Sequence, residues 1–154
     1  DSGRTVQAMS ELVGKSGRGE ELQKNADEKI EFLREIYETR PTVSVFFQIS
    51  DENLYSINGE HLISQGMDVC NGMNIFSDSK ISVPLVSKES VLALNPDFIV
   101  ISKPENGSES RWKDRWGQYA GFAEKLRWID PGLVSRPSLR MLDGIERLCE
   151  LIHE

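Results

Sequence analysis

The chain has 154 residues, of which 38% are hydrophobic and 28% charged, and this composition predicts a single globular domain with its own core. Its formal net charge of −7 argues against nucleic acid as a partner, because phosphate binding requires a basic face. No run of about eighteen apolar residues occurs, so no transmembrane segment is predicted. The first residues lack the apolar core of a signal peptide and there is no start methionine, so we expect a processed chain or a fragment.

The first forty residues predict two helices. Residues 5–14 place apolar side chains on one face, and a glycine-rich break follows at 14–19. Residues 20–40 repeat apolar side chains at helical spacing and carry acidic residues in the first turn, where the helix dipole favours them. Pro41 follows the expected end of this long helix.

Strands and helices alternate beyond residue 40. Short segments rich in β-branched and aromatic residues predict strands at 42–50, 97–102 and 126–130. Helical spacing predicts helices at 61–70, 88–94, 111–119 and 138–152. Ser87 is the expected N-cap of the second of these helices, and Asn71-Gly72 is expected to turn the chain after the first.

This order of elements predicts an α/β fold, with an open and mainly parallel sheet between two layers of helices. Ligands of such sheets bind at the loops that follow the carboxyl ends of the strands. Here these loops are residues 50–60, 103–110 and 130–137.

The sequence offers little for catalysis. It contains no nucleotide-binding glycine motif and no nucleophile elbow. The two histidines are His61, at the start of a predicted helix, and His153, next to the C-terminus. Two histidines are too few for a histidine-rich metal site. We therefore expect no enzyme activity, no cofactor and no metal.

The two cysteines, Cys70 and Cys149, are far apart in the sequence and do not form a CxxC motif. Free buried cysteines are common, so the residues by themselves leave open one disulfide or two unrelated thiols.

Residues 45–76, VFFQISDENLYSINGEHLISQGMDVCNGMNIF, resemble the C-terminal lobe of periplasmic vitamin B12-binding proteins, which serve ABC importers and belong to the helical-backbone (class III) solute-binding proteins. The resemblance continues through PLVSKESVLALNPDFIVIS (84–102) and IDPGLVSRPSLRMLDGIERLC (129–149), and covers about residues 40–152. Siderophore and haem binders of the class share the pattern in 84–102. The NGEHLIS and VCNGMNIF stretches lean toward the cobalamin branch.

Members of this family have two α/β lobes joined by one long helix, and they hold the ligand between the lobes. The resemblance implies that residues 1–40 are a helical segment that includes the interlobe helix. It implies that residues 41–154 form a three-layer, Rossmann-like C-terminal lobe and that the N-terminal lobe is absent. The implied function is that of a periplasmic, non-enzymatic carrier, which captures cobalamin or a related corrinoid and delivers it to the permease of an ABC importer.

Two further features are implied by the resemblance. The family pairs cysteines at the positions of Cys70 and Cys149, so a disulfide is expected, and a stable disulfide belongs in an oxidising compartment, here the periplasm. Glu89 lies where the family places a carboxylate that docks into arginines of the permease. The alternative for Glu89 is a first-turn glutamate that interacts favourably with the helix dipole.

The ligand-binding residues implied by the resemblance are Gln48, Tyr55, Asn58, Val83, Asp130 and Arg136. Tyr55 falls at a cleft aromatic, whose face suits a flat corrin ring. Gln48 and Asn58 supply amides that can meet the side-chain amides of a corrin. Arg136 matches a cleft arginine just before the last helix.

Two positions depart from the family pattern. Val83 stands where the best-known branch has a cleft tryptophan. Gly132 stands where the family has an acidic residue, so Asp130 is the nearest carboxylate.

Trp112 and Trp116 are expected to pack on a helix face rather than to add surface to the cleft.

Two alternatives remain open. The first is a ferric-siderophore or haem carrier of the same class. An anionic ferric siderophore requires several basic residues in the cleft, and Arg136 and Lys103 are the candidates in the loops. Haem requires an axial ligand to its iron, and Tyr55 is the candidate for that role. The second, more remote, is a cytoplasmic α/β enzyme or regulatory domain, which predicts free thiols.

Overall fold

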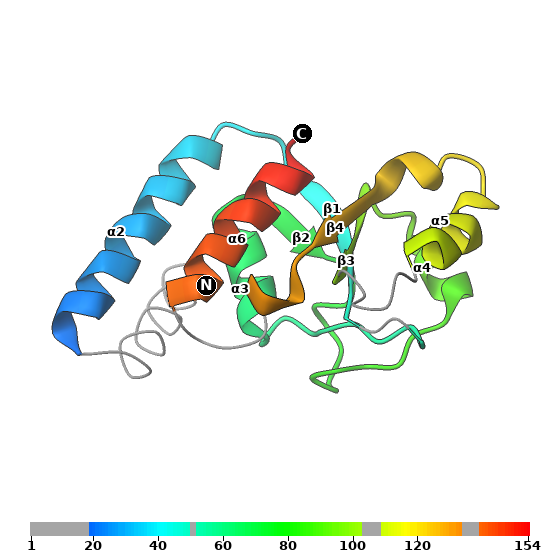
Figure 1. The fold of residues 1–154 in the computed structure, drawn as a ribbon, viewed down its shortest axis with the longest axis horizontal. Helices are drawn as coiled ribbons and strands as arrows, with labels where there is room; N and C mark the ends of the chain where they lie inside the picture. Colours follow the sequence, from blue (N-terminus) through cyan, green and yellow to red (C-terminus); the bar gives the residue numbers. More distant parts are fainter. Residues whose placement is uncertain (1–18, 50–51, 103–108, 134–138) are drawn as a thin grey trace.

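The computed structural model describes residues 19–49, 52–102, 109–133 and 139–154. The helix predicted at residues 5–14 lies outside these ranges. Figure 1 shows the described part as a sheet with helices on its two faces. The predicted α/β class is therefore confirmed.

The sheet has four strands in the order β2-β1-β3-β4, and every neighbouring pair is parallel. The strands are β1 (Val43–Gln48), β2 (Gly72–Asn74), β3 (Phe98–Ser102) and β4 (Leu126–Ile129). The central pair, β1 and β3, is almost wholly buried, as their uncharged, β-branched and aromatic sequences predict. Because every neighbouring pair of strands is parallel, the carboxyl ends of all four strands lie at one edge of the sheet.

Strand β2 is a correction, because a turn was expected at Asn71-Gly72. Asn71 takes a left-handed conformation with φ of 62°, and the chain then enters the sheet. The Asn71 side chain donates to the carbonyls of Tyr37 (2.8 Å) and Arg40 (3.1 Å). Its own carbonyl accepts the N–H of Val43 at 3.0 Å, which aligns β2 with β1. A three-residue strand is too short for its periodicity to be recognised in the sequence.

Two groups of helices cover the two faces. One face packs against α2 (Glu20–Tyr37), α3 (Leu62–Val69) and α6 (Leu139–Ile152), and the other against α4 (Lys88–Leu94) and α5 (Glu109–Gly117). Successive residues of β1 alternate between these two cores, as the pleat requires: Val45 and Phe47 join the first, and Phe46 the second. The three-layer arrangement is therefore confirmed. Short 3-10 turns, η1 (Ala123–Lys125) and η2 (Pro131–Leu133), flank β4.

Helix α4 begins and ends where its sequence predicts. The hydroxyl of Ser87 accepts the N–H of Ser90 at 3.1 Å and caps the N-terminus. Asn95 closes the helix in the left-handed conformation, with φ of 46°.

A disulfide joins Cys70, the C-cap of α3, to Cys149 in α6, with 5.8 Å between the two Cα atoms. Both cysteines are fully buried in the larger core. The pairing that the family resemblance implied is confirmed. It links two helices that lie on the same face of the sheet.

Every helix in the described ranges is too short or too polar to cross a membrane.

Candidate ligand-binding site

A ribbon of two extended segments lies beyond the carboxyl ends of β1 and β2. Its halves are residues 54–58 and 82–86. Backbone bonds hold them together, from the N–H of Ser56 to Pro84 (3.0 Å), of Asn58 to Ser82 (2.9 Å) and of Val86 to Leu54 (2.8 Å). The ribbon brings loop residues from two separate parts of the chain to the edge where α/β sheets bind ligands.

Tyr55 and Val83 both lie in this ribbon. Tyr55 is half-buried and forms an antiparallel bridge with Leu85. Val83 is 40% exposed, and its neighbours Ile81 and Leu85 are 66% and 65% exposed. Ile81 and Leu85 were not predicted as site residues from the sequence. The alternation of apolar Ile81, Val83 and Leu85 with Ser82 and Pro84 could have indicated an extended segment with one exposed face. In the structure, the carbonyls of Ser82 and Pro84 bond to the other half of the ribbon.

The amides of Gln48 and Asn58 are buried rather than displayed. Gln48 is fully buried, and its Oε1 accepts the indole N–H of Trp116 at 3.1 Å. Asn58 is 3% exposed, donates to the carbonyl of Ser79 at 3.1 Å and accepts the N–H of Glu60 at 3.0 Å. A direct contact with a ligand would have to replace these bonds.

Asp130 is exposed at the end of β4, and its Oδ1 accepts the N–H of Gly132 at 2.8 Å. The structure thus brings Tyr55, Val83 and Asp130 to the same edge of the sheet. Arg136 and Lys103 lie outside the described residues.

Asn74 is a structural residue of this edge that the sequence analysis missed. It is 4% exposed at the end of β2. Its Nδ2 donates to the carbonyl of Ile57 (2.8 Å) and to the hydroxyl of Ser64 (2.7 Å), and its Oδ1 accepts the N–H of Phe76 at 2.9 Å. A buried amide with all these bonds fixes the loop after β1 against β2 and α3.

Glu89 is exposed in the first turn of α4, and it forms no ion pair with another residue of the described ranges. Its carboxylate is therefore accessible to a partner. This position is also the one in which a glutamate favours the helix dipole, so the geometry is compatible with both readings of Glu89.

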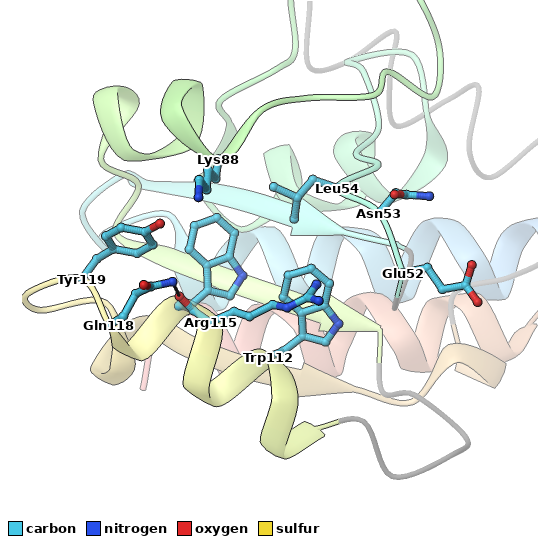
Figure 2. A pocket seen from close by; sticks show the side chains of 9 residues that line it. Glu52, Asn53, Leu54, Lys88, Trp112, Arg115, Gln118 and Tyr119 are labelled. Carbon is cyan, nitrogen blue, oxygen red and sulfur yellow. Dashed lines mark hydrogen bonds between the residues drawn. The ribbon is translucent and has the colours of Figure 1, made fainter.

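A pocket of about 330 Å³ lies beside α5, as Figure 2 shows. Trp112 and Trp116 form part of its wall, and they are 3% and 2% exposed. Their expected packing on a helix face is confirmed. Of the residues expected to bind ligand, the five that the structure describes do not line this pocket.

His61 predicts a dependence of stability on pH. Its Nδ1 accepts the N–H of Ile63 at 3.2 Å and caps α3, so the cap requires an unprotonated Nδ1. Burial lowers the pKa of His61 below its ordinary value of 6.5. Because the folded pKa is the lower one, this contribution is fully present above pH 6.5 and is lost as the pH falls through the folded pKa.

The test compares urea unfolding of the wild type and His61→Asn at about pH 7.5 and about pH 5. Asparagine keeps a capping oxygen but does not titrate in this range. We expect the wild type to lose more stability than the variant between the two pH values. Equal losses would show that His61 does not contribute to the pH dependence.

Within the described ranges, no group of three or more histidine, cysteine, aspartate or glutamate side chains is placed to hold a metal ion.

Known proteins share both the sequence and the fold of the chain. It is 25% identical over 145 residues to the vitamin B12-binding protein of Vibrio cholerae, a match that covers 94% of this chain and 52% of the relative. It is 26% identical over 155 residues to an ABC transporter substrate-binding lipoprotein of Bacillus subtilis, covering 93% of this chain and 48% of that protein. No family model matches the chain.

The crystal structure of the periplasmic vitamin B12-binding protein of Vibrio cholerae superimposes with a TM-score of 0.74 at 22% identity, over 96% of this chain and 61% of that one. The chain spans about half the length of the curated relatives it matches. These findings confirm the resemblance: in sequence and in fold, the chain is similar to about half of a periplasmic solute-binding protein of the vitamin B12-binding type.

Proposed function

We propose that this chain is the C-terminal lobe of a periplasmic solute-binding protein, which captures cobalamin or a related corrinoid and delivers it to the permease of an ABC importer. The observation that carries the proposal is the match to a vitamin B12-binding protein over nearly all of this chain and about half of the relative. One lobe of a two-lobe clamp would give such a match. In this proposal the ligand is cargo, and capture requires no covalent chemistry and no cofactor.

We propose that residues 1–40 include the interlobe helix and that residues 41–154 form the lobe. The packing of α2 on this lobe supports the assignment of α2 as the interlobe helix. Ala26, Ile30 and Leu33 bury one face of α2 in the core of the lobe. On the same side, Lys29 Nζ lies 3.0 Å from Oε1 of Glu146 in α6. The helix is therefore held by apolar burial and by the partly exposed ion pairs of Lys29 with Glu146 and Asp143.

The exposed part of the ribbon is the proposed surface for the corrin ring. Tyr55 and Val83 contribute apolar area, and Ile81 and Leu85 extend it. Burying such area against a flat ring stabilises a complex by about 25 cal/mol for each Å² removed from water. Asp130 and Arg136 are proposed to meet polar substituents of the ligand. Gln48 and Asn58 are proposed to face the corrin amides, with the bonds described above as the competing partners.

The ligand is tested by calorimetry with cyanocobalamin. The samples are these 154 residues and the natural protein with any sequence that precedes or follows them. We expect tight binding by the two-lobe protein and weak or no binding by this lobe, because half of the clamp is missing. Haemin and a ferric hydroxamate are titrated in parallel. If the two-lobe protein binds haemin or the hydroxamate but does not bind cyanocobalamin, the corrinoid assignment is wrong and that other ligand takes its place.

The disulfide supports the proposed compartment. A buried disulfide persists in an oxidising environment, which the periplasm provides. The alternative of a cytoplasmic α/β enzyme or regulatory domain predicts free thiols at Cys70 and Cys149, and the structure joins them instead.

Glu89 is proposed as the contact of this lobe with the permease. We expect Glu89→Lys to weaken binding of the loaded protein to its transporter by about ten-fold or more, because a charge-assisted pair with arginine is replaced by repulsion. Corrinoid affinity should stay unchanged. The measurement is association with the transporter in detergent or nanodiscs.

Glu35→Lys is the matched control, since Glu35 is also an exposed helical glutamate but lies on α2. Unchanged docking of Glu89→Lys, with only a loss of helix stability, would assign Glu89 to the helix dipole instead.

A further inference from the structure

The pocket beside α5 has the size and the wall of a small-ligand site. It is lined by α5 and the two residues that follow it, Gln118 and Tyr119, by the loop of residues 52–54 and by the start of α4 (Figure 2). Its volume of about 330 Å³ falls at the lower end of the range of small-molecule sites, about 300–1,000 Å³. Nothing in the proposed corrinoid function uses it.

The aromatic wall of the pocket is rigid. Trp112, Trp116 and Tyr119 recur at helical spacing and all line the pocket. Trp116 donates its indole N–H to the buried Gln48 at 3.1 Å. The ring of Phe122 stacks on that of Trp116, with 6.0 Å between their centroids. A ring entering the pocket would therefore meet a surface that is already in place.

Two cations flank this aromatic wall. The guanidinium carbon of Arg115 lies 4.9 Å from the ring centroid of Trp112, and Lys88 faces the pocket from the start of α4 (Figure 2). Neither cation forms an ion pair with a carboxylate in the described part of the chain. Glu52 also lines the pocket, but it already has an interaction within the protein. In a chain with a net charge of −7, two such cations beside one pocket favour an anion there.

We propose that this pocket binds a planar aromatic monocarboxylate. The ring lies in the pocket that Trp112, Trp116 and Tyr119 line, with Tyr119 as the most accessible of the three rings, and the carboxylate interacts with Arg115 and Lys88. None of the described residues proposed for the corrinoid surface lines the pocket, although Gln48 accepts the indole N–H of Trp116 in its wall. The inference is drawn from the pocket alone and does not rest on the proposed function.

The tryptophan side chains make the test direct. The chain has three tryptophans, so its indole N–H signals in an NMR spectrum of the ¹⁵N-labelled chain number three. Benzoate and 1-naphthoate are titrated, with benzamide and 1-naphthamide as neutral counterparts. We expect at least one acid to shift the signals of Trp112 and Trp116 to saturation, while Trp128 in β4, outside the pocket lining, changes little. The amide should bind about ten-fold more weakly than its acid.

Surface variants separate the cations from the fold. Arg115→Gln and Lys88→Gln should each weaken binding of the acid by about three-fold, the effect of one partly solvated charge. Lys113→Gln removes the same charge from an exposed position of α5 outside the pocket and should leave binding unchanged. The proposal is overturned by the absence of saturable shifts with both acids, by equal affinity for acid and amide, or by equal effects of Lys113→Gln and Arg115→Gln.

Discussion

Replacing both cysteines, as Cys70→Ala with Cys149→Ala, is expected to lower the free energy of unfolding by roughly 4 kcal/mol. The disulfide closes a loop with a sequence separation of 79 residues, so its main effect in the chain-entropy model is to restrict the unfolded chain. Alanine is the appropriate replacement because both positions are fully buried, and a serine hydroxyl would add the cost of an unpaired polar group.

Guanidinium unfolding measures this loss, with and without a reductant. The wild type should lose stability on reduction, whereas the double variant should not respond. The bond ties α3 to α6, so we expect amide protons of both helices to exchange faster in the variant. A double variant within about 1 kcal/mol of the oxidised wild type would show that the bond contributes little to the stability of the lobe.

Gly144→Ala is expected to destabilise the protein by about 2–3 kcal/mol, although Gly144 lies inside helix α6. Helix propensity alone predicts the opposite sign, since alanine is favoured over glycine by about 1 kcal/mol in a helix interior. A Cβ at this position would clash with the backbone carbonyl oxygen of Leu133. That oxygen belongs to the backbone of η2, so relief requires η2 or α6 to move.

The control for this substitution is Gly117→Ala in α5. The nearest atom to a Cβ at Gly117 is the Cβ of Ala123 at 3.8 Å, an ordinary contact, so its effect should be neutral or slightly stabilising. Both variants are compared by urea unfolding. Because η2 directly follows Asp130, Gly144→Ala should also weaken any ligand contact made there. Equal stability of Gly144→Ala and the wild type would show that η2 can shift to accommodate the methyl group with no loss of unfolding free energy.

Much of the fold follows from local patterns in the sequence. The apolar face of α2, the uncharged strands β1 and β3, and the serine and asparagine at the two ends of α4 were all predicted where the structure has them. Each of these signals depends on residues that are close neighbours in the chain. Alternating strands and helices then predict a parallel sheet, because a strand that returns through a helix pairs in parallel.

Strand β2 and the ribbon at the carboxyl edge depend on partners that are distant in sequence. β2 is aligned by bonds between Asn71 and the chain before β1, and the ribbon joins residues 54–58 to 82–86. The disulfide was neither predicted by local sequence patterns nor first recognised in the tertiary structure. The residues alone left it open, and it was expected only through the family resemblance.

The candidate site shows the same division. The sequence pattern predicted that Tyr55 and Asn58 lie in the loop after the first strand, at the edge where ligands of such sheets bind. Their role in ligand binding, and that of Gln48, was implied only by the family resemblance. Only the tertiary structure decided that the two amides are buried and bonded within the lobe while Val83 is exposed. The same holds for the pocket beside α5, which needs Lys88 from one helix and Trp112 from another. Local periodicity specifies which elements form, whereas exposure and the meeting of side chains depend on how those elements pack.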